Sequence, residues 1–182
     1  GATAIISREG ASNRKNGLVI LDVSNPTDGV RVIARYDDQL NGGVHNIFIH
    51  EGHVYALSNG RRYDIISIED PENPQLLYEW RIENQDLHQR TGGMDVKHFK
   101  WNDRYYVVQS LQFQQGGPNP DLGGVVLDVT GLPDPTTVTE VARIRSPDTP
   151  GGFHNIFVYK HSNGRVLLIA TVSGPFAHVY DL

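Results

Sequence analysis

Gly42-Gly43-Val44-His45-Asn46-Ile47-Phe48 returns later in the chain as Gly151-Gly152-Phe153-His154-Asn155-Ile156-Phe157. A third and weaker copy, Gly92-Gly93-Met94-Asp95, keeps the glycine pair and an apolar residue but has Asp95 in the histidine position. The copies start 50 and 59 residues apart, which is too long for a helical-hairpin repeat and suits a unit of four strands with loops. The recurrence therefore predicts a repeat fold.

A second motif recurs out of phase with the first. Its copies are β-branched apolar runs that end in turn residues: Leu18–Pro26, Ile65–Pro71, Val125–Thr130 and His178–Leu182. Such runs are typical of buried strands and the turns that follow them. Because the two motifs alternate along the chain, we interpret them as parts of one repeated unit.

The apolar segments between turns predict an all-β chain, since no segment keeps an apolar period of 3.6 residues over ten or more positions. Grouping the predicted strands by the two motifs gives units of 3, 4, 4 and 3 strands, or 14 in all. We therefore predict a single domain, residues 1–182, that is an arc of about four blades of a larger β-propeller, each blade a four-stranded antiparallel sheet. The blades are expected at about 1–41, 42–91, 92–150 and 151–182, with the first lacking its innermost strand and the last its outermost. A Greek-key sandwich is the alternative, but it predicts no repeat.

Composition excludes several classes of function. The net charge is −5, from 16 basic and 21 acidic residues, and no Lys/Arg cluster is present, which argues against a nucleic-acid partner. The absence of cysteine excludes disulfides and thiolate metal sites. No apolar run approaches the roughly 18 to 20 residues that cross a bilayer, so we expect no transmembrane segment in this chain. Membrane association would need an anchor outside it, or a partner.

His45, Asp95 and His154 are the candidate metal ligands. The first strand of each blade lines the axis of a propeller, so matching positions on successive blades converge near one mouth of the channel. Two imidazoles and a carboxylate are a sound ligand set for zinc, iron or another divalent ion. Two other interpretations stay open: each histidine hydrogen-bonds the backbone of a neighbouring blade and holds the glycine-rich entry in register, or the histidines act in catalysis. A calcium site that uses Asn46, Asn155 and Asp95 offers too few oxygen ligands.

The segment Gln112–Gly123 is rich in glycine, proline and glutamine and predicts a long loop between two strands. Long loops on a compact repeat often carry contacts with other molecules. The candidate partner-contact residues on it are Gln114, Gln115, Asn119 and Asp121. No nucleophile elbow, phosphate loop or His-Glu-x-x-His motif is present, so the sequence favours a protein that is not an enzyme and names no catalytic residue or cofactor.

The segments Leu18–Pro26, Ser67–Pro74 and Val126–Val129 resemble the LVIVD-repeat proteins. These are bacterial β-propellers, often exported or surface-attached, and they include the choice-of-anchor B group. The His-Asn pairs His45-Asn46 and His154-Asn155 also look like the openings of the inner strands in that family. The resemblance implies a propeller located in the periplasm, on the cell surface or outside the cell, and it supplies no activity. Our first hypothesis is a scaffold that binds a protein partner within a larger assembly. The alternatives are a metal-dependent enzyme and a propeller that binds carbohydrate or another small ligand.

Overall fold

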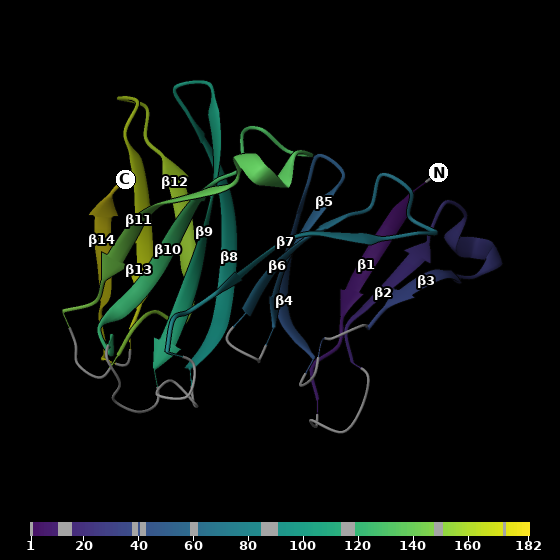
Figure 1. Ribbon diagram of the computed structural model, residues 1–182, viewed down its shortest axis with the longest axis horizontal. Helices are drawn as coiled ribbons and strands as arrows, with labels where there is room; N and C mark the ends of the chain where they lie inside the picture. The colour runs from purple at the N-terminus through teal and green to yellow at the C-terminus, as the bar shows by residue number, and fades with distance from the viewer. Residues whose placement is uncertain are drawn as a thin grey trace.

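The computed structural model describes residues 2–10, 16–37, 40, 43–58, 62–84, 91–113, 119–147, 151–172 and 174–182, which form four antiparallel sheets (Figure 1). The first sheet contains β1 (Thr3–Ser7), β2 (Leu18–Asp22) and β3 (Arg31–Tyr36). The second contains β4 (Val44–His50), β5 (His53–Ser58), β6 (Arg62–Ser67) and β7 (Gln75–Arg81). The third contains β8 (Thr91–Trp101), β9 (Arg104–Phe113), β10 (Leu122–Asp128) and β11 (Thr139–Arg145). The fourth contains β12 (Ile156–Lys160), β13 (Val166–Thr171) and β14 (Ala177–Asp181).

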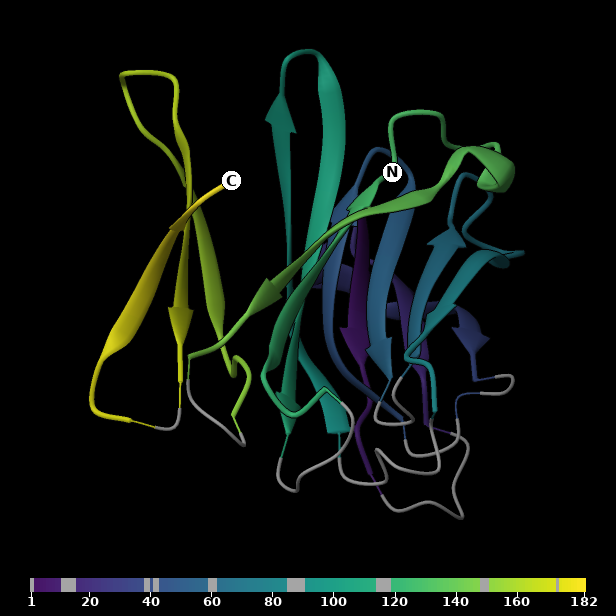
Figure 2. The same cartoon turned by 60° about the vertical axis from the view of Figure 1, so that its left-hand side comes forward.

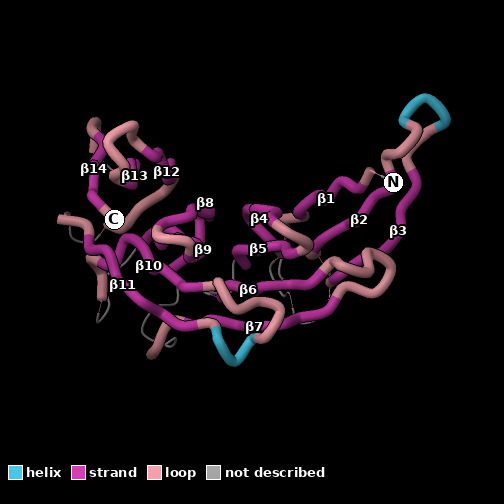
Figure 3. Tube along the Cα trace, turned by 90° about the horizontal axis from the view of Figure 1, so that it is seen from above, coloured by secondary structure: helices cyan, strands magenta, loops and turns pink. Residues whose placement is uncertain are grey.

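The four sheets follow one another along an open arc. Seen from above, β4, β8 and β12 lie on the concave side of the arc, and β7 and β11 lie on its convex side (Figure 3). Within each sheet, neighbouring strands are also neighbours in the chain, so each sheet is a meander. Successive meanders about a common axis are the blades of a β-propeller. The prediction of an all-β propeller arc is confirmed, with 3, 4, 4 and 3 strands as expected.

Two short 3₁₀ segments, Pro26–Asp28 and Pro135–Thr137, lie in turns of the first and third sheets. No helix in the described part of the chain has the length and apolar character needed to span a membrane.

The β8–β9 hairpin is longer than the sequence predicts. The apolar pattern of the sequence predicts strands at Met94–Lys100 and Arg104–Ser110, but the ladder continues through the pairs Thr91↔Phe113 and Gly92↔Gln112. In this sheet the glycine pair is therefore part of the first strand. In the second and fourth sheets it precedes the first strand.

β1 takes the place of a second strand. Gly43 forms an isolated bridge with Glu9, just after β1, and Gly152 forms the same bridge with Gln112 of β9. Because β9 is the second strand of its sheet, the matching bridge gives β1 the same place. The first sheet thus has no innermost strand among the described residues, as the repeat predicted.

The bridging glycines explain why the motif begins with them. Gly43 and Gly152 have φ angles of +83° and +86°, which favour glycine. A Cβ at Gly43 would lie 2.4 Å from the carbonyl oxygen of Arg8, and one at Gly152 would lie 2.1 Å from that of Leu111. In the second and fourth sheets, the second glycine of the pair therefore lets the blade start against the backbone of the blade before it.

The apolar core lies between the sheets in three clusters. Leu18 and Ile66 belong to the cluster between the first and second sheets. Tyr63 and Leu127 belong to the largest cluster, between the second and third sheets. Val108, Phe153 and Leu168 belong to the cluster between the third and fourth sheets. Each blade is thus held by burial of its faces against its neighbours.

Aspartates at strand ends repeat a small polar motif. Asp22 accepts a hydrogen bond from the Ser24 amide at 3.0 Å, and Asp128 accepts one from the Thr130 amide at 3.0 Å. The recurrence of Asp22, Asp128 and Asp181 at strand ends predicts such caps. The prediction is confirmed for Asp22 and Asp128, whereas Asp181 pairs with Arg165.

Candidate functional site

His45 and His154 occupy matching positions beside the bridging glycines. His45 Nδ1 lies 2.9 Å from Glu9 Oε1, and His154 Nδ1 lies 2.8 Å from Gln112 Oε1. Carboxylate and amide oxygens only accept hydrogen bonds, so Nδ1 carries the proton in both rings. Each histidine thereby links the start of its blade to the end of the second strand of the preceding blade. Glu9 lies just after β1, and Gln112 lies near the end of β9. This geometry corresponds to the register-holding interpretation, with a side chain as the partner.

Asp95 is buried and connects three successive sheets. It is 3% exposed, and its Oδ1 accepts hydrogen bonds from Asn46 Nδ2 of β4 at 2.9 Å and from its neighbour Val96 N at 2.8 Å. Its Oδ2 accepts the amide of Ile156, the first residue of β12, at 3.0 Å. The Lys97 ammonium also contacts Oδ1 and supplies a positive charge. The carboxylate therefore holds the inner strands of the second, third and fourth sheets together.

In the structure, Asp95 occupies the position that Asn46 and Asn155 have in their sheets. The sequence motif instead placed Asp95 at the position of the histidines. Asn46 Oδ1 accepts the amide of the next residue, Ile47, at 2.8 Å, as Asp95 Oδ1 does with Val96. The amide of Asn155 donates to Thr171 Oγ1 at 2.9 Å, as the amide of Asp95 donates to Ser110 Oγ at 2.8 Å. The ladders are irregular here, between Val44 and Asn46 and between Gly93 and Val96, so counting residues from the glycine pair fails by one position.

The structure does not gather the three candidate metal ligands around one point. Within the described ranges, no group of three or more His, Asp or Glu side chains is placed to hold a metal ion. Both carboxylate oxygens of Asp95 accept hydrogen bonds inside the fold. In His45 and His154 it is Nδ1, and not Nε2, that contacts Glu9 and Gln112. A metal ion at His45, Asp95 and His154 remains a prediction.

The candidate partner-contact residues divide between described and undescribed parts of the chain. Gln114 and Gln115 lie outside the described residues. Asn119 Oδ1 accepts hydrogen bonds from Arg145, and Asp121 Oδ1 accepts one from Arg145 Nη1 at 2.8 Å. Asn119 and Asp121 are thus tied to β11 of the same sheet, and their contact with a partner remains a prediction.

The outermost strands of the second and third sheets are joined by polar contacts. Trp80 Nε1 of β7 donates to Glu140 Oε2 of β11 at 2.8 Å. Arg143 of β11 donates to Glu83 at 2.6 Å and also pairs with Glu140. The hydrogen bonds from Arg143 lower the pKa of Glu83 to about 2. These contacts close the convex side of the junction between the two sheets.

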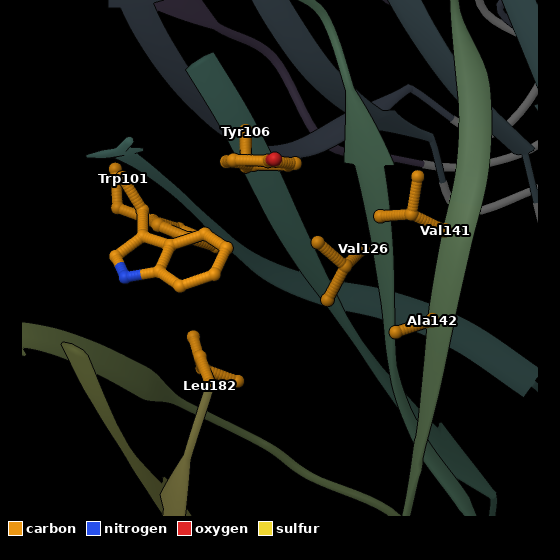
Figure 4. Close-up of a pocket in the computed structure, with 7 residues that line it drawn as sticks. Trp101, Tyr106, Val126, Val141, Ala142 and Leu182 are labelled. Atoms are coloured by element: carbon orange, nitrogen blue, oxygen red, sulfur yellow. The ribbon is translucent and has the colours of Figure 1, made fainter. Parts of the chain in front are cut away.

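The corresponding place between the third and fourth sheets is open and forms an apolar pocket of about 270 Å³ (Figure 4). The third sheet contributes most of its wall and the end of the chain contributes the rest: Phe99, Trp101, Tyr106, Val126, Val141, Ala142 and Leu182. The Phe99 and Tyr106 rings stack with centroids 5.2 Å apart, and Trp101 is 44% exposed. Only the Trp101 indole and the Tyr106 hydroxyl bring polar side-chain atoms to this wall. The pocket suits an apolar group.

The sequence signal for this pocket was weak. The size of aromatic side chains predicts packing between blades for Tyr105, Tyr106, Trp80 and Trp101, and Trp80 and Tyr105 do pack in the main core. Adjacent residues of a strand face opposite sides, so Tyr105 and Tyr106 meet different neighbouring sheets. Only strand order and register show that Tyr106, Val126 and Ala142 share one face.

Part of the chain is similar to a known family. Residues 12–37 match the family model described as LVIVD repeat. This segment contains β2, the 3₁₀ turn Pro26–Asp28 and β3. No curated protein sequence matches the chain.

Proposed function

Because the chain carries an LVIVD repeat within an open arc of propeller blades, we propose that it belongs to an extracytoplasmic bacterial scaffold that binds a protein partner and catalyses no reaction. Its blades are assigned to residues 1–41, 42–91, 92–150 and 151–182 of one domain. The observation that supports partner binding is the apolar pocket between the third and fourth sheets, next to a free strand edge.

The other junctions show why the pocket is open: there the outermost strand of the earlier sheet supplies an aromatic side chain, whereas β11 brings only Val141 and Ala142 to the pocket. Between the second and third sheets, Trp80 of the outermost strand β7 packs in the core and bonds to Glu140 of β11. Between the first and second sheets, Tyr36 of the outermost strand β3 packs against the core of that junction. The fourth sheet ends at β14, whose outer edge has no paired strand among the described residues. The pocket lies beside that edge, because Leu182 directly follows β14.

The edge of β14 is the place of the outermost strand that the fourth blade lacks among the described residues, so the proposed occupant is an extended segment, from a partner protein or from chain outside residues 1–182. Such a segment pairs with β14 as an added strand, and main-chain hydrogen bonds supply part of its affinity. A large apolar side chain on the face of the segment turned toward the third sheet enters the pocket. At the preceding junction, β11 of the later sheet brings Glu140 against the second sheet in the same way. The pocket is continuous with the apolar cluster of the third and fourth sheets, since Phe99, Tyr106, Val126 and Leu182 belong to both.

A peptide that copies β7 tests this surface directly. The probe is the sequence Gln75–Arg81 with Trp80 replaced by phenylalanine, so that the tryptophans of the protein report binding. Because Trp101 lines the pocket and Trp80 is buried elsewhere, a saturable change in fluorescence that disappears in Trp101→Phe indicates binding at the pocket.

Two variants decide whether the pocket is responsible. Ala142→Arg places a charge on the pocket wall and is expected to abolish the change in fluorescence. Val30→Arg is the matched control, since Val30 is 56% exposed and does not line the pocket. No saturable change in the unmodified chain, or equal binding by Ala142→Arg, would count against the pocket as a partner site.

Binding of a small apolar ligand is the second candidate. Three aromatic side chains, Phe99, Trp101 and Tyr106, lie together in this pocket, which is what the ligand-binding alternative required. Carbohydrate needs several polar groups for its hydroxyls, and the wall offers two, so the apolar ligand class is favoured. Titration with a hydrophobic dye tests this function, with Ala142→Arg as the variant in which the pocket is blocked. Dye binding that the β7 peptide does not displace would favour a small ligand over strand addition.

The metal-dependent alternative has its own test. Elemental analysis of the purified protein measures bound zinc and iron per chain. A stoichiometric metal that is lost in the double variant His45→Ala with His154→Ala would favour an ion at the channel mouth over the scaffold proposal.

A further inference from the structure

Histidines also gather at the junction of the second and third sheets. They belong neither to the apolar pocket nor to the contacts of His45, Asp95 and His154. His50 ends β4 and His98 lies near the end of β8, so both are at the opposite end of their strands from the bridging glycines. Their ring centroids are 3.7 Å apart, and the Tyr105 ring is within 5.8 Å of both. Phe48 stacks on the other side of His98 at 6.2 Å.

One ring nitrogen of each imidazole in this group has no hydrogen-bond partner. The Nε2 atoms of His50, His53 and His98 are buried and make no hydrogen bond. Buried polar nitrogens without partners are costly, and a protonated imidazole needs two acceptors instead of one. The closed junction therefore tolerates the neutral rings better than the charged ones.

The surrounding charges offer little compensation for a proton. The titratable or charged groups around the two rings are Glu51 of the β4–β5 turn, His53 and Tyr55 of β5, Lys100 of β8 and Tyr105 of β9. The carboxylate of Glu51 is 3.7 Å from His50 Nε2 and its side chain is 63% exposed, so solvent screens it. The Lys100 ammonium, 5.2 Å from the Tyr105 ring centre, adds a like charge.

We propose that the facing imidazoles of His50 and His98 are an acid-sensitive contact, which loosens the inner junction of the second and third sheets as the pH falls below 6.5. In the closed junction the His98 ring, held against His50, stays neutral. When the inner strands separate locally, the His98 ring reaches water and binds a proton, so acid shifts the equilibrium toward the open junction.

The direction of the pKa shift agrees with the geometry. Burial, and then the neighbouring His50, lower the pKa of His98 from 6.5 to about 4. Between these two pH values, His98 is protonated when the junction is open and neutral when it is closed. Opening therefore becomes more favourable as the pH falls from 6.5 to 4. Since His98 is only partly buried, we expect opening to increase about tenfold between pH 7 and pH 5.

Hydrogen exchange of the whole chain, followed by mass spectrometry at several pH values, tests the proposal. After correction for intrinsic rates, peptides from β4 and from the end of β8 should exchange about tenfold faster at pH 5 than at pH 7. Peptides from β13 should not change, because no member of the histidine group lies in the fourth sheet. His98→Phe keeps an aromatic ring against Phe48 and removes the titrating group, so it should abolish the acceleration. His161→Gln, an exposed histidine of the β12–β13 turn, should leave it unchanged.

Three results would overturn the proposal: exchange of β4 and β8 that is independent of pH, equal acceleration in β13, or acceleration that persists in His98→Phe. If His98→Phe does not fold, the ring resonances of His98 in the unmodified chain decide by NMR. A titration midpoint at or above 6 overturns the proposal, and one near 4 supports it.

Discussion

At the scale of single residues, glycine and aspartate at the start of the inner strands have the clearest physical roles. Gly43 and Gly152 each combine a positive φ angle with a close approach to the backbone of the preceding blade. Asp95 combines deep burial with hydrogen bonds to three sheets. In both cases a small change in side chain has a large expected effect, because the neighbouring atoms belong to other blades.

Gly152→Ala tests the close approach. Gly164 has a similar φ of +90°, but a Cβ there would meet nothing within 4 Å, so Gly164→Ala isolates the cost of the backbone conformation. That cost is about 1 to 2 kcal/mol of unfolding free energy. Gly152→Ala should cost at least about 1 kcal/mol more, since its Cβ would lie 2.1 Å from Leu111 O. Denaturant unfolding measures both, and equal losses would contradict the role of the clash.

Asp95→Asn tests the three-sheet contact. The amide group presents one NH₂ where a carboxylate oxygen now accepts, so at least one buried donor loses its partner. We expect a loss of about 1 to 3 kcal/mol of unfolding free energy. Asp103→Asn, at a side chain 97% exposed and paired only with Lys100 across the turn, is the control with little expected effect. If both variants unfold at the same denaturant concentration, Asp95 does not hold the sheets.

At the scale of elements, the junctions between sheets are closed in different ways on their two sides. Near the axis, backbone bridges and buried side chains such as Asp95 join one blade to the next. On the convex side, β7 and β11 are joined through Trp80, Glu140 and Arg143. The convex contacts are partly exposed, so they are more sensitive to pH and salt than the inner ones.

Glu83→Gln tests the pH dependence of the Arg143–Glu83 ion pair on the convex side. The pKa of Glu83 is lowered from 4.5 to about 2, so between these values the unfolded carboxyl binds a proton that the folded one does not. The stabilisation from Glu83 is therefore present above pH 4.5 and is lost as the pH falls toward 2. The variant should lose about 1 kcal/mol or less at neutral pH, and its stability should fall less steeply below pH 4.5.

Thermal unfolding between pH 2 and pH 7 provides the comparison, with Glu72→Gln in the exposed β6–β7 turn as the control. A slope for Glu83→Gln as steep as that of the unmodified chain would show that Arg143 does not stabilise Glu83.

At the scale of residues 1–182 as a whole, no described residue covers the outer face of the fourth sheet, which stands at the left of Figure 2. On the fourth sheet, Phe157, Tyr159 and Val179 are 56%, 47% and 62% exposed. Phe157 and Val179 flank Ile169 in register, so they form one apolar layer on the face turned away from the third sheet. On the first sheet, Ile6 and Val32 are 52% and 45% exposed. Apolar faces of this kind favour association.

Residues 1–182 produced alone should therefore self-associate as concentration rises. Phe157→Lys combined with Val179→Lys should shift the sedimentation profile toward the monomer, because charges on the outer face of the fourth sheet oppose its burial. Val30→Lys, outside this face, should not. A concentration-independent monomer, or no effect of the double variant, would contradict association through this face.

The local pattern of the chain was sufficient for the fold. Alternating apolar residues, paired glycines and turn residues report on strands and their order, because each depends on neighbours in the chain. The strand counts and the missing inner strand of the first sheet followed from them and agree with the structure. Packing between strands far apart in the chain was not readable in this way. The alignment of Asp95 with Asn46 depends on irregular ladders, while the His50–His98 contact and the aromatic pocket depend on how neighbouring blades meet. Those features are set by register and by the approach of one sheet to another, which no local period encodes.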